Sequence, residues 1–283
     1  MIDALNYKIF YKLLILILIL IYNYRKSIKI KNRISIIVPT YNREKLITLS
    51  IRSALNQTHN NIELLIIDDC SDDNTEKEID KIKDERLRYI KLRKNLGANY
   101  ARNLGIKKAT GEYITFLDSD DLFRYNKLEK QLNNLKKYKS NLDFCKICIH
   151  INNEFNFSVP NKIQEKKIMK GKIYDELSNG NFISTQAILL KNSNLQKFLF
   201  DINLPRLQDY DFILRIIPNA KVSFTKEVLV DIYIQKDSIS YSLPKLERAV
   251  KILLNKNYTF NNIQKKNFVN YLNYLLKSKI FNI

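Results

Sequence analysis

The sequence feature that most constrains the fold is an alternation of short strand-like runs with helix-like segments, beginning at residue 34. The strand-like runs are mostly apolar and rich in β-branched side chains, which predicts strands buried on both faces. They occupy residues 34–38, 63–67, 87–92 and 113–117. The helix-like segments between them occupy residues 43–56, 72–82 and 99–109. This order favours an α/β fold with a Rossmann-like, mostly parallel sheet flanked by helices.

The second half of the chain is less regular. Strands are predicted at 143–151, 182–190, 221–224 and 228–234, helices at 125–138 and 208–217, and a loop or hairpin at 152–172. From residue 244 a tail rich in Lys and Asn carries apolar residues at helical spacing, which predicts amphipathic helices that pack on the domain. We therefore divide the chain into an N-terminal segment (1–33), a central domain (34–240) and a helical tail (241–283).

Polar groups follow three of the predicted strands at the point where each strand ends. They are Pro39-Thr40-Tyr41-Asn42, Asp68-Asp69 and Asp118-Ser119-Asp120-Asp121. Because the carboxyl ends of parallel strands share one edge of a sheet, we expect these groups to converge. Helix capping could explain single acids, but it does not explain two acidic pairs at the same edge. A hard divalent cation, Mg²⁺ or Mn²⁺, with bound phosphate completing its shell, does explain them.

Two further acids occur together in the predicted helix 208–217. Asp209 and Asp211 would point about 200° apart on a helix, so we expect only one of them to face the acidic edge. A carboxylate there could act as the general base for a hydroxyl. The alternative is an ordinary acidic start of a surface helix, and the sequence leaves both open.

The composition restricts the classes of molecule that this chain could bind, but it does not identify one. Lys and Arg number 48 against 29 Asp and Glu, a formal net charge of +19, which attracts nucleotide phosphates and anionic lipid headgroups. The lysines are scattered rather than clustered, so we expect no nucleic-acid partner. Cys145 and Cys148 lie three apart on a predicted strand and point to opposite faces, which argues against a shared zinc ion.

The N-terminal segment differs from the rest of the chain. Residues 13–22 are uninterrupted apolar residues, and five basic residues follow between 25 and 33. This pattern is typical of an interfacial helix or a short anchor on an anionic cytoplasmic leaflet. The alternative is a helix packed on the domain. Positive charge on both sides of the run leaves the topology undecided.

Four sequence segments together resemble glycosyltransferase family 2. They are ISIIVPTYNRE, ELLIIDDCSDDNT, NLGANYARNLGIKKATGEYITFLDSDD and LQDYDFILR, and the resemblance covers about residues 34–235. It implies the GT-A fold, with a nucleotide-sugar-binding half (34–122) and an acceptor half (123–240). It also implies an inverting transfer of a sugar from a nucleoside diphosphate, UDP being favoured, with Mg²⁺ or Mn²⁺. The implied acceptor is a glycan or glycolipid in cell-surface polysaccharide or lipid-linked glycan synthesis.

The resemblance also implies a role for individual residues near the donor. Pro39, Thr40 and Tyr41 would frame the nucleotide base, and Asp69 would hydrogen-bond to it. Asp118 would lie by the ribose and diphosphate. The metal ligand would be Asp120.

Four more residues complete the implied site. Asn95, Gly97 and Arg102 are similar to the loop and helix that lie near the donor in this family. Asp209 resembles the base that deprotonates the acceptor hydroxyl.

The sequence departs from the family pattern at several places. Cys70 stands where the family usually has Gly, Gln208 where Glu is commoner, and Gln235 and Lys236 where Arg or His often face the diphosphate. The chain has no Trp and therefore lacks the QxxRW signature of processive synthases, which favours a single addition. The alternative function is a catalytically silent sugar-nucleotide-binding or membrane-associated scaffold protein. The presence of all three donor acids argues against it.

Overall fold

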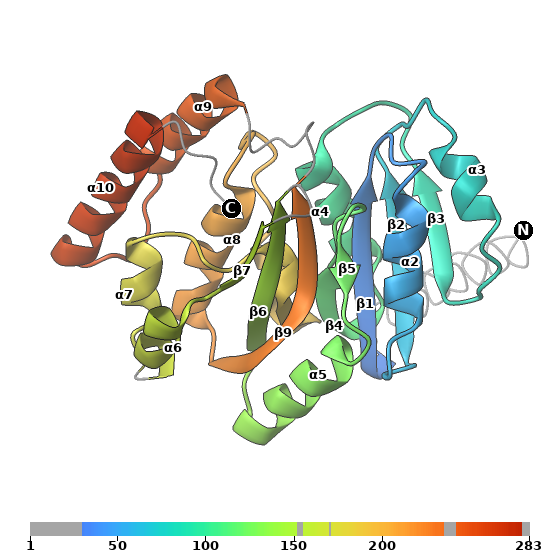
Figure 1. Cartoon of the computed structure of the whole chain (residues 1–283), viewed down its shortest axis with the longest axis horizontal. Coiled ribbons are helices and arrows are strands. Elements are labelled where there is room, and N and C mark those ends of the chain that lie inside the picture. The colour runs from blue at the N-terminus through green and yellow to red at the C-terminus, as the bar shows by residue number, and fades with distance from the viewer. Residues whose placement is uncertain (1–29, 152–154, 170, 235–241, 279–283) are drawn as a thin grey trace, which may run out of the picture.

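The computed structural model describes residues 30–151, 155–169, 171–234 and 242–278 (Figure 1). The strands are β1 (Ile30–Thr40), β2 (Ile62–Asp68), β3 (Leu87–Lys91), β4 (Gly111–Phe116), β5 (Leu122–Phe123), β6 (Leu142–Ile151), β7 (Phe155–Val159), β8 (Ile188–Lys191) and β9 (Val222–Ile234). The α-helices are α2 (Ile47–Leu55), α3 (Thr75–Asp80), α4 (Ala98–Lys108), α5 (Lys127–Tyr138), α6 (Lys162–Met169), α7 (Ile173–Ser178), α8 (Gln208–Ile216), α9 (Leu243–Leu254) and α10 (Asn262–Ser278). Three short 3₁₀ helices are η1 (Thr185–Ala187), η2 (Asn192–Lys197) and η3 (Ile217–Asn219).

The strands of the described chain form one sheet in the order β3-β2-β1-β4-β8-β6-β9-β5, and β7 pairs with β6. Strands β1 to β4 run parallel, whereas β8 is antiparallel to β4 and to β6. Because β9 is parallel to β6, both run in the direction of β1 to β4. The sheet is therefore mixed: β1 to β4, β6 and β9 run in one direction, and β5, β7 and β8 run in the other. The carboxyl ends of β1, β2, β4, β6 and β9 nevertheless share one edge.

The centre of the sheet is buried on both faces, as its continuous apolar runs predict. In β1, Ile36, Ile37 and Val38 are fully buried. Figure 1 shows α2 in front of the sheet and α4 and α8 behind it. Gly105 of α4 lies directly over Ile37, so close that a Cβ at this position would collide with the isoleucine side chain. The glycine is what lets α4 approach the sheet.

Three predicted strands were wrong in their extent. The segment 182–190 is a strand only at Ile188–Lys191, because η1 and a stretch without regular structure precede it. The two strands predicted at 221–224 and 228–234 form a single strand, β9, whose pairing with β6 is irregular near Cys145 and Lys146. Residues 30–33, assigned above to the N-terminal segment, belong to β1. In each case the apolar pattern of the sequence put the end of a strand in the wrong place.

The tail forms two helices that pack on the second half of the domain, beside α7 and at the far end of the molecule from α3 (Figure 1). Leu253 of α9 and Leu272 of α10 are fully buried in the single hydrophobic core. The apolar run at 13–22 lies outside the described residues. None of the helices that the structure describes has both the length and the hydropathy that crossing a bilayer requires.

Candidate active site

The carboxyl end of β1 lies between the two strand ends that carry the paired acids. The backbone amide of Asp69 donates to the carbonyl of Thr40 at 2.8 Å, and the amide of Leu117 donates to the carbonyl of Ile37 at 3.0 Å. One strand therefore separates the acids that follow β2 from those that follow β4, a span of about 10 Å. We call this group the acidic rim. Its members are Asp68, Asp69, Asp118, Asp120 and Asp121.

The turn after β2 is held by the fully buried Asp68. Its Oδ1 accepts hydrogen bonds from the amide and the hydroxyl of Ser71, at 2.8 and 2.6 Å, and its Oδ2 accepts one from the Tyr89 hydroxyl at 2.5 Å. Cys70 adopts a φ of 69° in this turn, in the left-handed region that glycine enters freely. The turn therefore has a backbone conformation that suits glycine. Placing a cysteine in it costs about 1–2 kcal/mol of folding free energy.

Asp69 organises the loop that leads into α4. Its two carboxylate oxygens accept hydrogen bonds from the amides of Leu96 and Gly97, both at 2.7 Å. The pKa of Asp69 is raised, because burial raises it by more than these two amide hydrogen bonds lower it. Gly97 has a φ of 89° and precedes the first residue of α4, while Asn95 is exposed in the same loop. A contact between Asp69 and a nucleotide base stays a prediction.

The end of β1 offers an exposed aromatic ring. Tyr41 is 43% exposed, whereas Pro39 and Thr40 are buried. We had expected the strand to end before Pro39. Instead, β1 continues through Pro39 to Thr40.

A network of side chains fixes the acids that follow β4. The Arg102 guanidinium, which is buried, donates to Asp118 Oδ1 at 2.7 Å. The Gln186 amide donates to Asp118 Oδ2 at 2.8 Å and to Asp121 Oδ2 at 2.6 Å. Burial, together with the negative charges of Asp120 and Asp118, raises the pKa of Asp121 well above its usual range. Gln186 was not among the predicted site residues, since it lies in the segment expected to be a plain strand.

Asp120 presents a carboxylate to the same edge. Its side chain is 21% exposed, and its Oδ2 lies 3.5 Å from Nε of the Arg43 guanidinium. A partly exposed carboxylate among neighbouring acids is a ligand of the hard-oxygen type that Mg²⁺ and Mn²⁺ prefer. The donor chemistry of Asp120 therefore fits the predicted metal.

The two acids of α8 separate as the helical geometry predicts. Burial raises the pKa of Asp209. The nearby charge of Arg102 lowers this pKa, and that of Asp118 raises it. Asp211 faces the C-terminal region instead, where it accepts hydrogen bonds from Lys256 at 2.8 Å and Tyr258 at 2.7 Å. Of the pair, Asp209 is the one placed on the side of the acidic rim.

Four buried polar atoms on segments around the acidic rim lack a hydrogen-bond partner within the described part of the chain. They are Thr40 Oγ1, Arg102 Nε, Ser184 Oγ and Arg206 Nη2. Buried polar groups are normally paired, so these four atoms are candidates for contact with a polar ligand.

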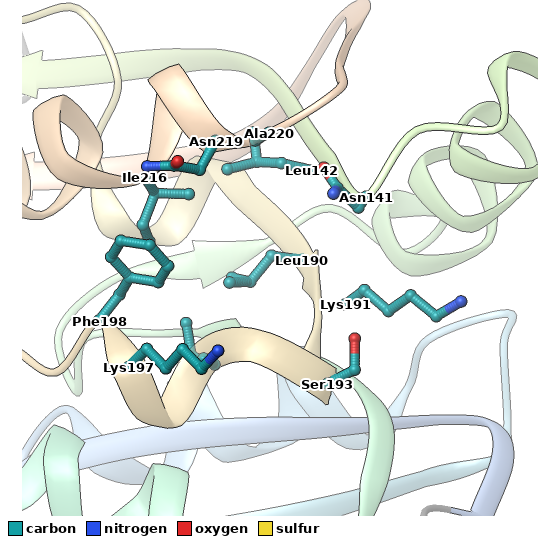
Figure 2. A pocket seen from close by; sticks show the side chains of 11 residues that line it. Asn141, Leu142, Leu190, Lys191, Ser193, Lys197, Phe198, Ile216, Asn219 and Ala220 are labelled. Atoms are coloured by element: carbon teal, nitrogen blue, oxygen red, sulfur yellow. The ribbon is translucent and has the colours of Figure 1, made fainter. Parts of the chain in front are cut away.

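The structure also contains a cavity of about 260 Å³ that lies away from the acids (Figure 2). Leu142 and Leu190, near the amino end of β6 and the carboxyl end of β8, form part of its apolar wall beside Phe198, and Lys191 lies at its edge. This is the edge of the sheet opposite the acidic rim. The cavity is therefore not the predicted site.

One cluster on β6 and β9 was not foreseen from the sequence. Ligand atoms of Cys148, His150 and Asp231 lie within 4.8 Å of one another, although the sequence spacing of His150 gave no sign of it. Asp231 is bound at both oxygens by the Arg124 guanidinium, at 2.9 and 3.0 Å, and by His150 at 2.9 Å. An arginine already balances the charge of this carboxylate.

Comparison with known proteins gives a consistent result. The model of Glycosyl transferase family 2 matches residues 35–197. The chain is 34% identical over 230 residues to an uncharacterized glycosyltransferase of Haemophilus influenzae, covering 81% of this chain and 86% of that protein. It is 40% identical over 139 residues to the Escherichia coli UDP-Glc:alpha-D-GlcNAc-diphosphoundecaprenol beta-1,3-glucosyltransferase WfgD. That match covers 48% of this chain and 55% of the enzyme, about half of each.

Among solved structures, the chain is similar to S. aureus TarS 1-349 in complex with UDP-GlcNAc. The TM-score is 0.68 at 22% sequence identity, covering 87% of this chain and 73% of that one. This similarity establishes a GT-A-like fold. Together, the family match over more than half of the chain, the relative matched over 81% of the chain and the fold show that the chain belongs to glycosyltransferase family 2.

Proposed function

We propose that this chain transfers a hexose from a UDP-sugar to a hydroxyl of a lipid-linked saccharide, with inversion at the anomeric carbon. The observation that carries the proposal is the meeting of Asp69, Asp118 and Asp120 around the end of β1, with Asp209 on the same side. These acids are far apart in the sequence. Binding of a nucleotide, its diphosphate and a divalent metal would explain why they lie at one edge of the sheet.

The donor would bind along the acidic rim. The exposed Tyr41 ring offers a stacking surface for the base, and the loop held by Asp69 lies beside it. Arg102 Nε, buried and unpaired, is available to a phosphate oxygen. UDP is favoured because TarS was solved with UDP-GlcNAc and WfgD is named for UDP-Glc.

Asp120 would hold the divalent metal. When bound, Mg²⁺ or Mn²⁺ offsets the negative charge that develops on the leaving diphosphate. The chain itself supplies few glycine amides for cradling phosphate, five glycines in all. Charge compensation therefore has to come from a cation and from side chains such as Arg102.

Asp209 would act as the general base. Its carboxylate takes the proton of the acceptor hydroxyl, whose oxygen attacks the anomeric carbon from the face opposite the diphosphate. The bond between that carbon and the diphosphate oxygen breaks as the new glycosidic bond forms, which inverts the configuration. Burial raises the pKa of Asp209, which makes it a stronger base than an exposed aspartate.

The acceptor is proposed from the relative and from charge. WfgD is named for an acceptor that carries a sugar on diphosphoundecaprenol. A net charge of +19 favours approach to an anionic membrane surface and so supports a reaction at the cytoplasmic face, in cell-surface polysaccharide or lipid-linked glycan synthesis. Nucleic acid has no part in this proposal.

The test is a panel of nucleotide sugars, each with and without Mn²⁺, read first by thermal stabilisation and then by UDP release. We expect a UDP-hexose to stabilise the chain in the presence of metal and to release UDP once a synthetic GlcNAc-diphospholipid is present to accept the hexose. Asp120→Asn should abolish the metal-dependent release, while the control Asp80→Asn, an exposed acid at the end of α3, should not. Normal release by Asp120→Asn would refute the metal site. Stabilisation without any UDP release would favour a silent binding protein.

A further inference from the structure

Asn181 connects the proposed base to the C-terminal helix. Its side-chain Nδ2 donates to Asp209 Oδ2 at 3.0 Å. Its backbone amide donates to the hydroxyl oxygen of Tyr271, on α10, at 3.2 Å. The asparagine precedes β8 in a stretch without regular structure, so neither contact is imposed by a helix or strand.

The amide of Asn181 is fixed in one orientation. Its Oδ1 accepts a hydrogen bond from the amide of Ile183 at 3.3 Å, which leaves the NH₂ group facing Asp209. Asp209 Oδ1 accepts from the amide of Tyr210 at 2.8 Å. Within the described residues, each carboxylate oxygen therefore has one donor and keeps a second lone-pair site for a substrate hydroxyl.

Helix α10 is itself held in place at this point. The Tyr271 ring meets the fully buried Tyr210 ring edge to face, with centroids 5.7 Å apart, and Phe268 packs on Tyr210 at 5.8 Å. Gly180 lies under Tyr271, where a Cβ would come within 3.2 Å of the ring. The ring, the glycine and the asparagine thus form a continuous support from α10 to α8.

We propose that Asn181 is a positioning residue for Asp209 and that Tyr271 holds Asn181, which makes α10 a working part of the transfer site. This inference rests on the proposed role of Asp209 as base. Asp209 and Tyr271 lie beyond the family match, which ends at residue 197, before α8 begins. In this proposal the C-terminal helices position the base as well as pack on the domain.

The support has a definite chemical consequence. A donor to the ionised carboxylate favours that form, so removing it should raise the pKa of the base as well as loosen its orientation. Transfer should then need a higher pH, and its maximal rate should fall. Donor binding, which depends on the acidic rim, should not change.

The experiment measures UDP release from UDP-glucose with Mn²⁺ and a synthetic GlcNAc-diphospholipid, as a function of pH. For Asn181→Ala we expect kcat at neutral pH to fall about ten- to a hundredfold, as for the loss of one hydrogen bond to a charged group. The acid limb of the pH profile should move to higher pH, and the Kd for UDP-glucose should be unchanged. Tyr271→Phe, which keeps the ring, should lower kcat several-fold. The matched control is Tyr274→Phe, an exposed tyrosine on the same helix.

The outcomes separate this inference from the proposed function. If Asp209→Asn transfers normally, Asp209 is not the base, and the proposed mechanism fails. If Asp209→Asn is inactive while Asn181→Ala keeps the kcat and pH profile of the wild type, only the positioning role is refuted. Equal effects of Tyr271→Phe and Tyr274→Phe would remove α10 from the site. Should Asn181→Ala not fold, Asn181→Ser and Tyr271→Phe carry the same test.

Discussion

Lys127, at the start of α5, is a charge buried beneath the acidic rim. It is fully buried, and its amine donates to Thr115 Oγ1 at 3.1 Å and to Gln131 Oε1 at 2.7 Å. The amine also lies 4.3 Å from the centroid of the Phe123 ring. Thr115 is in β4, the strand that leads to Asp118. We predict that replacing this lysine with methionine changes how stability depends on pH.

The magnitude follows from the pKa of the amine. Burial lowers the pKa of Lys127 from 10.5 to about 8. At about 1.4 kcal/mol per pKa unit, the buried charge costs the fold roughly 3 kcal/mol at neutral pH. Between pH 8 and 10.5 the unfolded chain holds a proton that the folded chain has released. The free energy of unfolding therefore rises with pH in this window, by about 2 kcal/mol between pH 7 and 9.5.

Urea unfolding at pH 7 and pH 9.5 measures this effect. The wild type should gain about 2 kcal/mol relative to Lys127→Met over that interval, because the other titrating groups cancel in the difference. Lys136→Met, at an exposed position of the same helix, serves as control and should follow the wild type. If Lys127→Met and the wild type change in parallel, the lysine is solvated in the folded protein, and the reasoning fails.

Three further changes have expected outcomes. Asp211→Asn should lower the free energy of unfolding by about 3 kcal/mol, since it removes a buried charge from its ion pairs; a loss below 1 kcal/mol in urea would contradict this. Gly111→Ala places a Cβ 2.6 Å from Ser35 Oγ and should cost about 1–3 kcal/mol, measured as a lower Tm. Gln186→Leu removes a donor from Asp118 and should weaken UDP-sugar binding about tenfold in a titration, and an unchanged Kd would argue against the network.

The donor half could be predicted because its signals are local. A continuous run such as 34–38 is enough to indicate a strand buried on both faces. Paired acids directly after two such runs then lie at one edge, whatever the loops between them do. The structure has this arrangement, and even the left-handed Cys70 keeps the turn after β2. Periodicity and topology together were sufficient here.

The acceptor half could not be predicted in the same way, because its contacts join distant segments. Gln186 reaches Asp118 across 68 residues, and Asn181 reaches Tyr271 across 90. The apolar content of 182–190 favoured a strand, yet residues 182–187 have no strand pairing, and only 188–190 belong to β8. No spacing rule in the sequence identifies a residue that acts by touching another segment.

The helix α8 ties these two halves together through its two acids. Asp209 faces the rim and is supported by Asn181, while Asp211 is anchored by Lys256 and Tyr258 from the segment between α9 and α10. A shift of the C-terminal helices would therefore move α8 through Asp211 and, at the same time, move the support of Asp209 through Tyr271. Because both connections end on one helix, the position of the base depends on the packing of the tail. It follows that a truncation before α10 should impair transfer more than donor binding, since the acids of the rim all precede α5 and no described contact joins them to α10.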